Sequence, residues 1–187
     1  MSEYLTWETY YMPPAQENES SLEFEARIHA SYWHRNQKRK YTGEPYIVHP
    51  AEVASIVRTV PHTEEMLAAA WLHDVVEDCG VNRGSINEHF GATVSVLVCR
   101  LTDISQLSDG NRAVRKAMDR QHSAEGCAEA QTVKLADLIS NSRSILAYDP
   151  NFAVRYMREK RALLTVMTKG DPTLWAEADR ICREAGY

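Results

Sequence analysis

Apolar residues recur at helical spacing along most of this chain, and almost nothing alternates as a strand would. One helix is expected to start at Ser20 or Ser21 and to run to about Lys40. Another is expected to follow Thr63, whose side chain can cap it, and to end before Gly80. Further helices are predicted to begin at Pro50 and to cover 92–101, 111–121, 131–146, 150–169 and 172–184, with a short polar stretch at 82–90. The pattern predicts an all-α fold.

A chain of 187 residues is the size of one domain with a single sizeable core. We therefore predict an N-terminal arm over residues 1–20 and one domain over 21–187. The arm is polar and contains Pro13 and Pro14. Four aromatic side chains could pin it to the body: Tyr4, Trp7, Tyr10 and Tyr11.

The net charge and the cysteines limit the partners and the cellular compartment that we expect for this protein. A net charge of −5 disfavours broad attraction to nucleic acid or to an anionic membrane. No apolar run is long enough to span a bilayer, and the first residues do not have the pattern of a signal peptide. Four dispersed cysteines without a CxxC pair indicate reduced thiols. We expect a cytoplasmic protein, a monomer or small homo-oligomer, that binds neither nucleic acid nor membrane.

The segment Trp71–Asp78 contains several side chains that could bind a metal or transfer a proton. It holds an imidazole and three carboxylates beside apolar residues that favour burial. On one helix His73 and Glu77 would lie four residues apart, as would Asp74 and Asp78, so each pair would share a side. Buried charges need partners or a metal, and a divalent cation would supply the compensation.

Two further residues complete a candidate metal site. His49 stands at the expected entrance of a helix, and Asp137 lies on a polar stripe beside an apolar helical face. With His73 and Asp74 they form a set of two histidines and two carboxylates, with positions open for water and substrate. Such mixed ligation suits Mn²⁺, Fe²⁺ or Zn²⁺. The alternative is an ion-paired structural cluster, because ion-pair networks also gather titratable groups.

These residues, in this order, resemble the H…HD…D signature of the HD-domain metal-dependent phosphohydrolases. More narrowly, four stretches resemble the hydrolase domain of RelA/SpoT proteins: His34–Lys40, Gly43–Pro50, Leu72–Asp78 and Val133–Asp137. The resemblance covers about residues 22–168. It implies an HD-domain helical bundle and a stand-alone small alarmone hydrolase.

The resemblance also implies a role for each matching residue. It implies metal ligation, usually of Mn²⁺, by four residues: His49, His73, Asp74 and Asp137. Glu77 and Asp78 would handle the attacking water and its proton. The resemblance assigns nucleotide contacts to Arg39, Lys40 and Asn141. Apart from the resemblance, we expect substrate contacts from Tyr46, Lys134 and Arg112, and the two cations among them would help to offset the charge of the diphosphate. For Arg112 a solvated helical face is the alternative. The reaction implied is removal of the 3′-pyrophosphate from (p)ppGpp, giving GDP or GTP and pyrophosphate.

Two departures from the family flank the expected nucleotide site. Tyr41-Thr42 adds one residue before Gly43, and Leu138 and Ser140 stand where Arg and His are typical. Both leave the metal chemistry intact and the base preference open. The adenine alarmone (p)ppApp is therefore an alternative substrate. A nucleotidase or phosphodiesterase acting on another nucleotide, and a sensor without catalysis, are further alternatives.

Overall fold

The computed structural model describes residues 10–16 and 18–187. Tyr4 and Trp7, two of the aromatic residues predicted to pin the arm, lie outside the described residues. Tyr10 does lie against the helix that follows, with its ring centroid 6.1 Å from that of Tyr32. Tyr11 is half exposed.

Helices account for nearly all regular structure in the described residues. Their order is α1 (Ser21–Trp33), α2 (Val48–Val57), α3 (Glu64–Leu72), α4 (Val75–Cys79), α5 (Arg83–Leu101), the 3₁₀ turn η2 (Leu107–Asp109), α6 (Arg112–Ala124), α7 (Ala128–Tyr148), α8 (Pro150–Leu164) and α9 (Pro172–Glu184). The described residues hold no strand beyond an isolated bridge between Lys38 and Pro45. The predicted all-α fold is confirmed. Within the same residues, no helix has the length and apolar character needed to cross a membrane.

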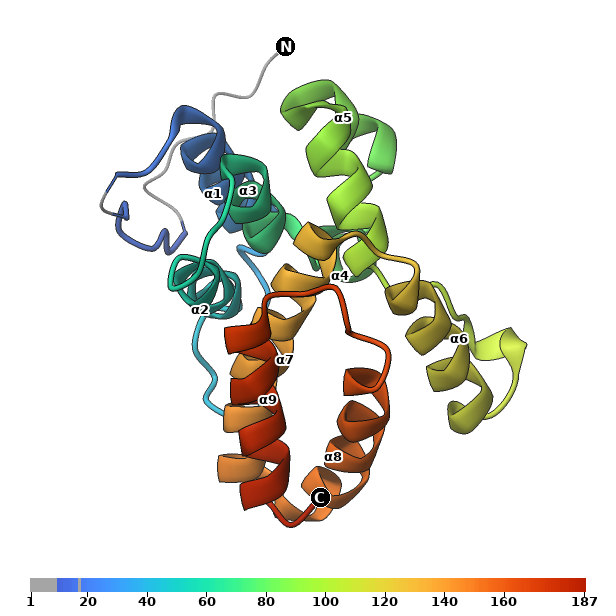
Figure 1. The fold of residues 1–187 in the computed structure, drawn as a ribbon. Coiled ribbons are helices and arrows are strands. Elements are labelled where there is room, and N and C mark those ends of the chain that lie inside the picture. Colours follow the sequence, from blue (N-terminus) through green and yellow to red (C-terminus); the bar gives the residue numbers. More distant parts are fainter. Residues whose placement is uncertain (1–9, 17) are drawn as a thin grey trace.

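Helix α7 runs through the middle of the molecule and packs against α2, α3, α5, α8 and α9 (Figure 1). Helices α1 and α2 both pack on α3, whose residues from Met66 to Leu72 are all buried. Several of the largest buried side chains of the core come from α3 and α7, among them Trp71, Leu135 and Leu138. Helices α3 and α7 thus form the centre of the fold, with Asp137 on α7 and Asp74 in the turn that follows α3.

Capping side chains set the predicted helix starts. The side chain of Thr63 accepts a hydrogen bond from the Met66 amide, and α3 begins at the next residue. Three further caps place the starts of α1, α6 and α9 as expected: Ser20, Asn111 and Asp171. These starts are confirmed because each depends on a local bond that the sequence itself specifies.

Two predicted helix ends are wrong. Helix α1 ends at Trp33, not near Lys40, because the chain then folds into a turn closed by the bond from the Arg39 amide to the Glu44 carbonyl, 2.8 Å. Gly43, at φ +72°, adopts the left-handed backbone that this turn requires. The expected helix between Thr63 and Gly80 is also interrupted, since residues 73–74 form a turn between α3 and α4.

Two more boundaries differ from the prediction. Helical structure already begins at Arg83, where Asn82 caps it, and Gly91 at φ +84° kinks α5 between its two halves. The polar stretch 82–90 is therefore mostly helical. Helix α8 ends at Leu164, short of the expected Lys169.

Candidate metal and catalytic site

Three segments bring the four predicted metal ligands together. His49 comes from the first turn of α2, His73 and Asp74 from the turn between α3 and α4, and Asp137 from the middle of α7. Nε2 of His49 lies 3.2 Å from Asp137 Oδ1 and 3.6 Å from Asp74 Oδ2. Nε2 of His73 lies 2.9 Å from Asp74 Oδ2 and 3.8 Å from Asp137 Oδ1. Both imidazoles therefore point at the same pair of carboxylates.

The nitrogen atoms of these histidines fit a cation. Nδ1 of His73 donates to the Ala70 carbonyl at 2.8 Å. Nδ1 of His49 donates to Ser140 Oγ at 2.9 Å, because that hydroxyl gives its own proton to Glu52. In both rings Nε2 is buried without a hydrogen-bond partner among the described residues. Two orphaned imidazole nitrogens facing two carboxylates are the donor set that a divalent metal ion takes.

The carboxylates of the cluster are held ionised. Burial alone would raise the pKa of Asp74, but His73 and then His49 outweigh it and hold the pKa well below its usual range. Burial would likewise raise the pKa of Asp137, but Lys134, His49 and His73 together outweigh it and hold the pKa well below its usual range. Burial likewise opposes the charge of His73, but Asp74 and Asp137 raise its pKa to about 9. A cation entering the cluster must therefore displace a proton.

Tyr46 adds a hydrogen bond to one carboxylate of the cluster. Its hydroxyl donates to Asp74 Oδ2 at 2.6 Å. Burial, together with the charge of Asp74, holds the pKa of this hydroxyl well above its usual range. The proton thus stays on Tyr46, and the bond orients Asp74 toward the histidines.

Glu77 and Asp78 lie on α4, within one turn of Asp74. A Glu77 oxygen accepts a hydrogen bond from the Asp103 amide. Partial loss of hydration raises the pKa of Glu77 to about 7, although Lys134 opposes the shift. Asp78 accepts a bond of 2.8 Å from Gln37 Nε2, so the loop after α1 reaches the catalytic candidates.

Two predicted nucleotide contacts touch a metal-ligand candidate instead of standing free. Lys134 Nζ lies 3.5 Å from Asp137 Oδ2, and Asn141 Nδ2 donates to Asp137 Oδ1 at 2.6 Å. Both residues come from the polar stripe of α7, one helical turn on either side of Asp137. They hold Asp137 in place and border the space beside it.

The predicted basic pair lies at the rim of the site. The Arg39 guanidinium lies 6.0 Å from the centre of the Tyr46 ring, next to the cluster. Lys40 is mostly exposed, and its Nζ lies 3.6 Å from Asp149 Oδ2. Tyr41, the residue that departs from the family spacing, donates to the same Asp149 at 2.9 Å. The extra residue thus fastens this loop to the start of α8.

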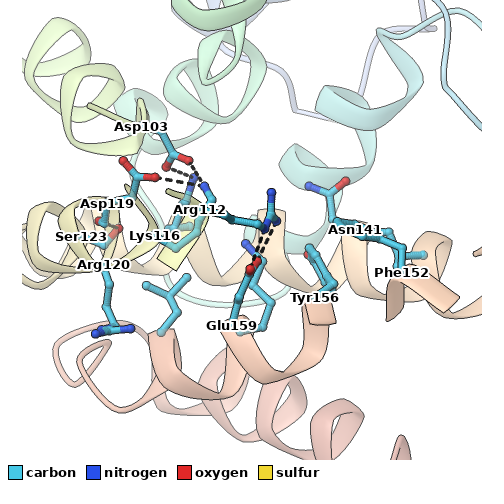
Figure 2. Close-up of a pocket in the computed structure, with 14 residues that line it drawn as sticks. Asp103, Arg112, Lys116, Asp119, Arg120, Ser123, Asn141, Phe152, Tyr156 and Glu159 are labelled. Carbon is cyan, nitrogen blue, oxygen red and sulfur yellow. Dashed lines mark hydrogen bonds and ion pairs between the residues drawn. The ribbon is translucent and has the colours of Figure 1, made fainter. Parts of the chain in front are cut away.

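A cavity of about 300 Å³ opens beside the cluster, between α6, α7 and α8 (Figure 2). Lys134 and Asn141 line it, so it continues from the metal-ligand candidates. Arg112 lies in it as well, but its guanidinium is paired with Glu159 through bonds of 2.7 and 2.8 Å. The predicted substrate contact by Arg112 would require this pair to share its charge with a ligand.

The sequence analysis did not predict that three further residues contact the site or line its cavity. Glu52 and Ser140 lie three residues after His49 and Asp137, respectively, so the helical period could have placed them beside those ligands. Lys160 lines the cavity, yet in the sequence it is one cation within a charged stretch of α8. Only the packing of α8 on α7 identifies it.

Comparison with known proteins gives consistent relatives. Residues 26–164 match the HD domain family. The mouse guanosine-3′,5′-bis(diphosphate) 3′-pyrophosphohydrolase is 37% identical over 131 residues, which are 68% of this chain and 72% of the relative. The Vibrio cholerae protein of the same description is 35% identical over 129 residues, which are 67% of this chain but only 18% of that protein. The chain thus spans less than a fifth of the bacterial relative.

A solved structure agrees with the sequence relatives. The metazoan orthologue of SpoT, described as hydrolysing ppGpp, superposes with a TM-score of 0.81 at 27% identity. The superposition covers 91% of this chain and 99% of that one. The likeness therefore extends over nearly the whole bundle.

Proposed function

The chain belongs to the HD-domain family, and on this premise we propose that it is a metal-dependent hydrolase that removes the 3′-pyrophosphate from (p)ppGpp. The products would be GDP or GTP and pyrophosphate. One observation carries the proposal: His49 and His73 direct orphaned Nε2 atoms at Asp74 and Asp137. Relatives of 35% and 37% identity are described by the same activity, which supports the choice of substrate.

We propose Mn²⁺ as the metal, held by these four side chains. Imidazole and carboxylate together suit this ion, and the family resemblance favours it. When bound, the ion lowers the pKa of the attacking water and offsets the charge of the pyrophosphate. Side chains of the protein would accept the proton of the water and bind the nucleotide.

Glu77 is proposed as the general base. A carboxyl group whose pKa is about 7 is substantially ionised at neutral pH and can still take up a proton, which is the balance that a general base needs. Its bond from the Asp103 amide fixes its direction. Asp78, held by Gln37, would orient the water or pass on the proton.

The substrate brings several negative charges to an acidic cluster, so cations must accompany it. Lys134 lies against Asp137 and would contact the 3′-pyrophosphate. Arg39, beside Tyr46, and the exposed Lys40 would approach the nucleoside from the rim. Asn141 and Tyr46 would also contact the nucleotide. Each is held in place by a hydrogen bond to a metal-ligand candidate, Asn141 to Asp137 and Tyr46 to Asp74.

The cellular location, the partner and the domain organisation are also proposals. We propose a cytoplasmic protein whose partner is a small nucleotide, with the hydrolase formed by a single domain over residues 21–187. A monomer or a small homo-oligomer would be sufficient, because all proposed site residues come from one chain.

Product analysis by ion-exchange chromatography tests the proposal. The protein would be incubated with ppGpp and, separately, with ppApp, each with Mn²⁺ and with chelator. We expect GDP and pyrophosphate from ppGpp in the presence of Mn²⁺ and no product with chelator. The ratio of the two rates measures the base preference that the Tyr41 and Ser140 departures leave open. No turnover of either nucleotide by the Mn²⁺-loaded protein would overturn the proposal in favour of another substrate or a sensor.

A further inference from the structure

The charges that line the 300 Å³ cavity are unequally paired (Figure 2). Arg112 is held by Glu159, and Lys116 lies 2.5 Å from Asp103 and 3.0 Å from Asp119. These cations are largely neutralised by their own partners. An anion entering the cavity would have to compete with three carboxylates for them.

Lys160 differs from these cations. Its Nζ lies over the Tyr156 ring, 4.9 Å from the centroid, and no carboxylate of the described residues comes within ion-pair distance of it. Burial, and next to it the charge of Lys134, lowers the pKa of this ammonium below its usual range. A cation that has lost water without gaining a carboxylate is stabilised by an anionic ligand.

The proposed substrate carries such an anion at a fixed place. In (p)ppGpp the ribose separates the 3′-pyrophosphate from a 5′-diphosphate or triphosphate. If the 3′ group lies at the Asp137 cluster, the 5′ group must lie further along the site. The cavity begins there, at Lys134 and Asn141, and has a volume of about 300 Å³.

We propose that Lys160 binds the 5′-phosphate group of the nucleotide and makes the enzyme select nucleotides phosphorylated at both the 3′ and the 5′ position. This inference rests on the proposed function, because it takes the 3′ group to be the one that is cleaved. Tyr156 supports the role by holding the Lys160 ammonium over the face of its ring. Lys160 is a specificity residue, since it is distant in sequence and in contacts from the hydrolytic pair on α4.

The test compares substrates that differ only at the 5′ position. Lys160→Met keeps the aliphatic stem and removes the charge, whereas Lys160→Arg keeps a cation. Arg158→Met removes a charge from the exposed face of the same helix and serves as the matched control. Hydrolysis of ppGpp and of guanosine 3′-diphosphate would be measured with each variant. Calorimetric binding of GDP and of guanosine would be measured in parallel.

With Lys160→Met we expect kcat/KM for ppGpp to fall about tenfold to a hundredfold, and GDP binding to weaken by a similar factor. Guanosine 3′-diphosphate and guanosine, which lack the 5′ phosphates, should be unaffected. Lys160→Arg should restore much of the loss, and Arg158→Met should match the wild type.

Two results would overturn the inference: equal losses with both hydrolysis substrates, or no loss with either. The binding arm separates this failure from failure of the proposed function. Suppose that the wild type hydrolyses neither substrate but binds GDP more tightly than Lys160→Met does. The 5′ subsite is then supported, and the proposed hydrolytic function is contradicted. If GDP binds the Lys160→Met variant as well as the wild type, the subsite falls whatever the catalytic result.

Discussion

Ser140 Oγ lies 2.9 Å from Nδ1 of His49 and donates its own proton to Glu52 at 2.6 Å, so the hydroxyl links a buried imidazole to a carboxylate. This chain of bonds fixes the ring orientation and keeps the Nδ1 proton away from the cluster. Nε2 of His49 is thereby left free to bind a cation. Such partners behind a metal-binding histidine commonly contribute strongly to metal affinity.

We predict that Ser140→Ala weakens Mn²⁺ binding about 10-fold to 100-fold, because His49 loses the acceptor that orients it. Isothermal titration of chelator-treated protein with Mn²⁺ measures the effect. Ser55→Ala is the matched control, because this exposed serine lies on α2, the helix of His49, and its hydroxyl donates to the Ala51 carbonyl of that helix. An unchanged Mn²⁺ affinity in Ser140→Ala, with helical content preserved, would show that the hydroxyl does not position the ligand.

Replacement of Glu77 should separate catalysis from metal binding. We predict that Glu77→Gln lowers kcat about 10²-fold to 10⁴-fold, the usual contribution of a general base, while the Mn²⁺ content stays at the wild-type level. Glu88→Gln, an exposed carboxylate on α5, should leave both quantities unchanged. Stopped-flow or quenched assays and metal analysis of the same samples would measure them. Wild-type turnover by Glu77→Gln would remove Glu77 from the mechanism.

The pH dependence of the rate follows from the same residue. The pKa of Glu77 is raised to about 7, and a general base acts in its ionised form, so the rate should rise as the pH increases through about 7. This acid limb should be absent from the residual activity of Glu77→Gln. Measurements of kcat/KM between about pH 5.5 and pH 9, at saturating Mn²⁺, test the prediction. A limb that persists in the variant would belong to another group.

The sequence predicts the helices of this protein well where a local bond sets their start, and poorly where tertiary contacts set their end. Thr63 and Asn111 cap α3 and α6 through side-chain bonds within three residues, so both starts could be read from the sequence. The end of α1 depends on a turn that pairs Arg39 with Glu44. Nothing in the basic run before that turn signals that the helix stops at Trp33.

The interrupted helix at residues 73–74 shows the same limit inside the site. Spacing by four residues suggested shared sides for His73 with Glu77 and for Asp74 with Asp78, which assumes one continuous helix. The turn instead directs His73 at Asp74 and Asp137 and leaves Glu77 and Asp78 on α4. Residue types and order could identify the set, but the break and the cavity beside Asn141 arise from packing between distant helices.

Glu23 connects three helices and should matter for stability. Its carboxylate is fully buried on α1, accepts from Trp71 Nε1 of α3 at 3.0 Å and pairs with Arg58 at the end of α2. We predict that Glu23→Ala lowers the free energy of unfolding by about 3 kcal/mol, because it leaves a largely buried guanidinium and an indole N–H without their partner. Glu25→Ala, exposed on the same helix, should change it by less than about 0.5 kcal/mol. Urea unfolding followed by circular dichroism measures both, and equal values would exclude a structural role for the pair.

Removal of the metal should lower the stability of the fold, since the ligand candidates come from α2, from the α3–α4 turn and from α7. At a Mn²⁺ concentration about 100 times Kd, binding to the folded state alone stabilises it by about 2.7 kcal/mol. We therefore predict a higher unfolding midpoint with Mn²⁺ than with chelator. Asp137→Ala should abolish this difference together with activity, whereas Asp109→Ala, an exposed carboxylate of η2, should retain both. Full Mn²⁺ content in purified Asp137→Ala would remove Asp137 from the ligand set and leave the two histidines and Asp74, whose ligand atoms lie within 4.8 Å of one another, as the metal site.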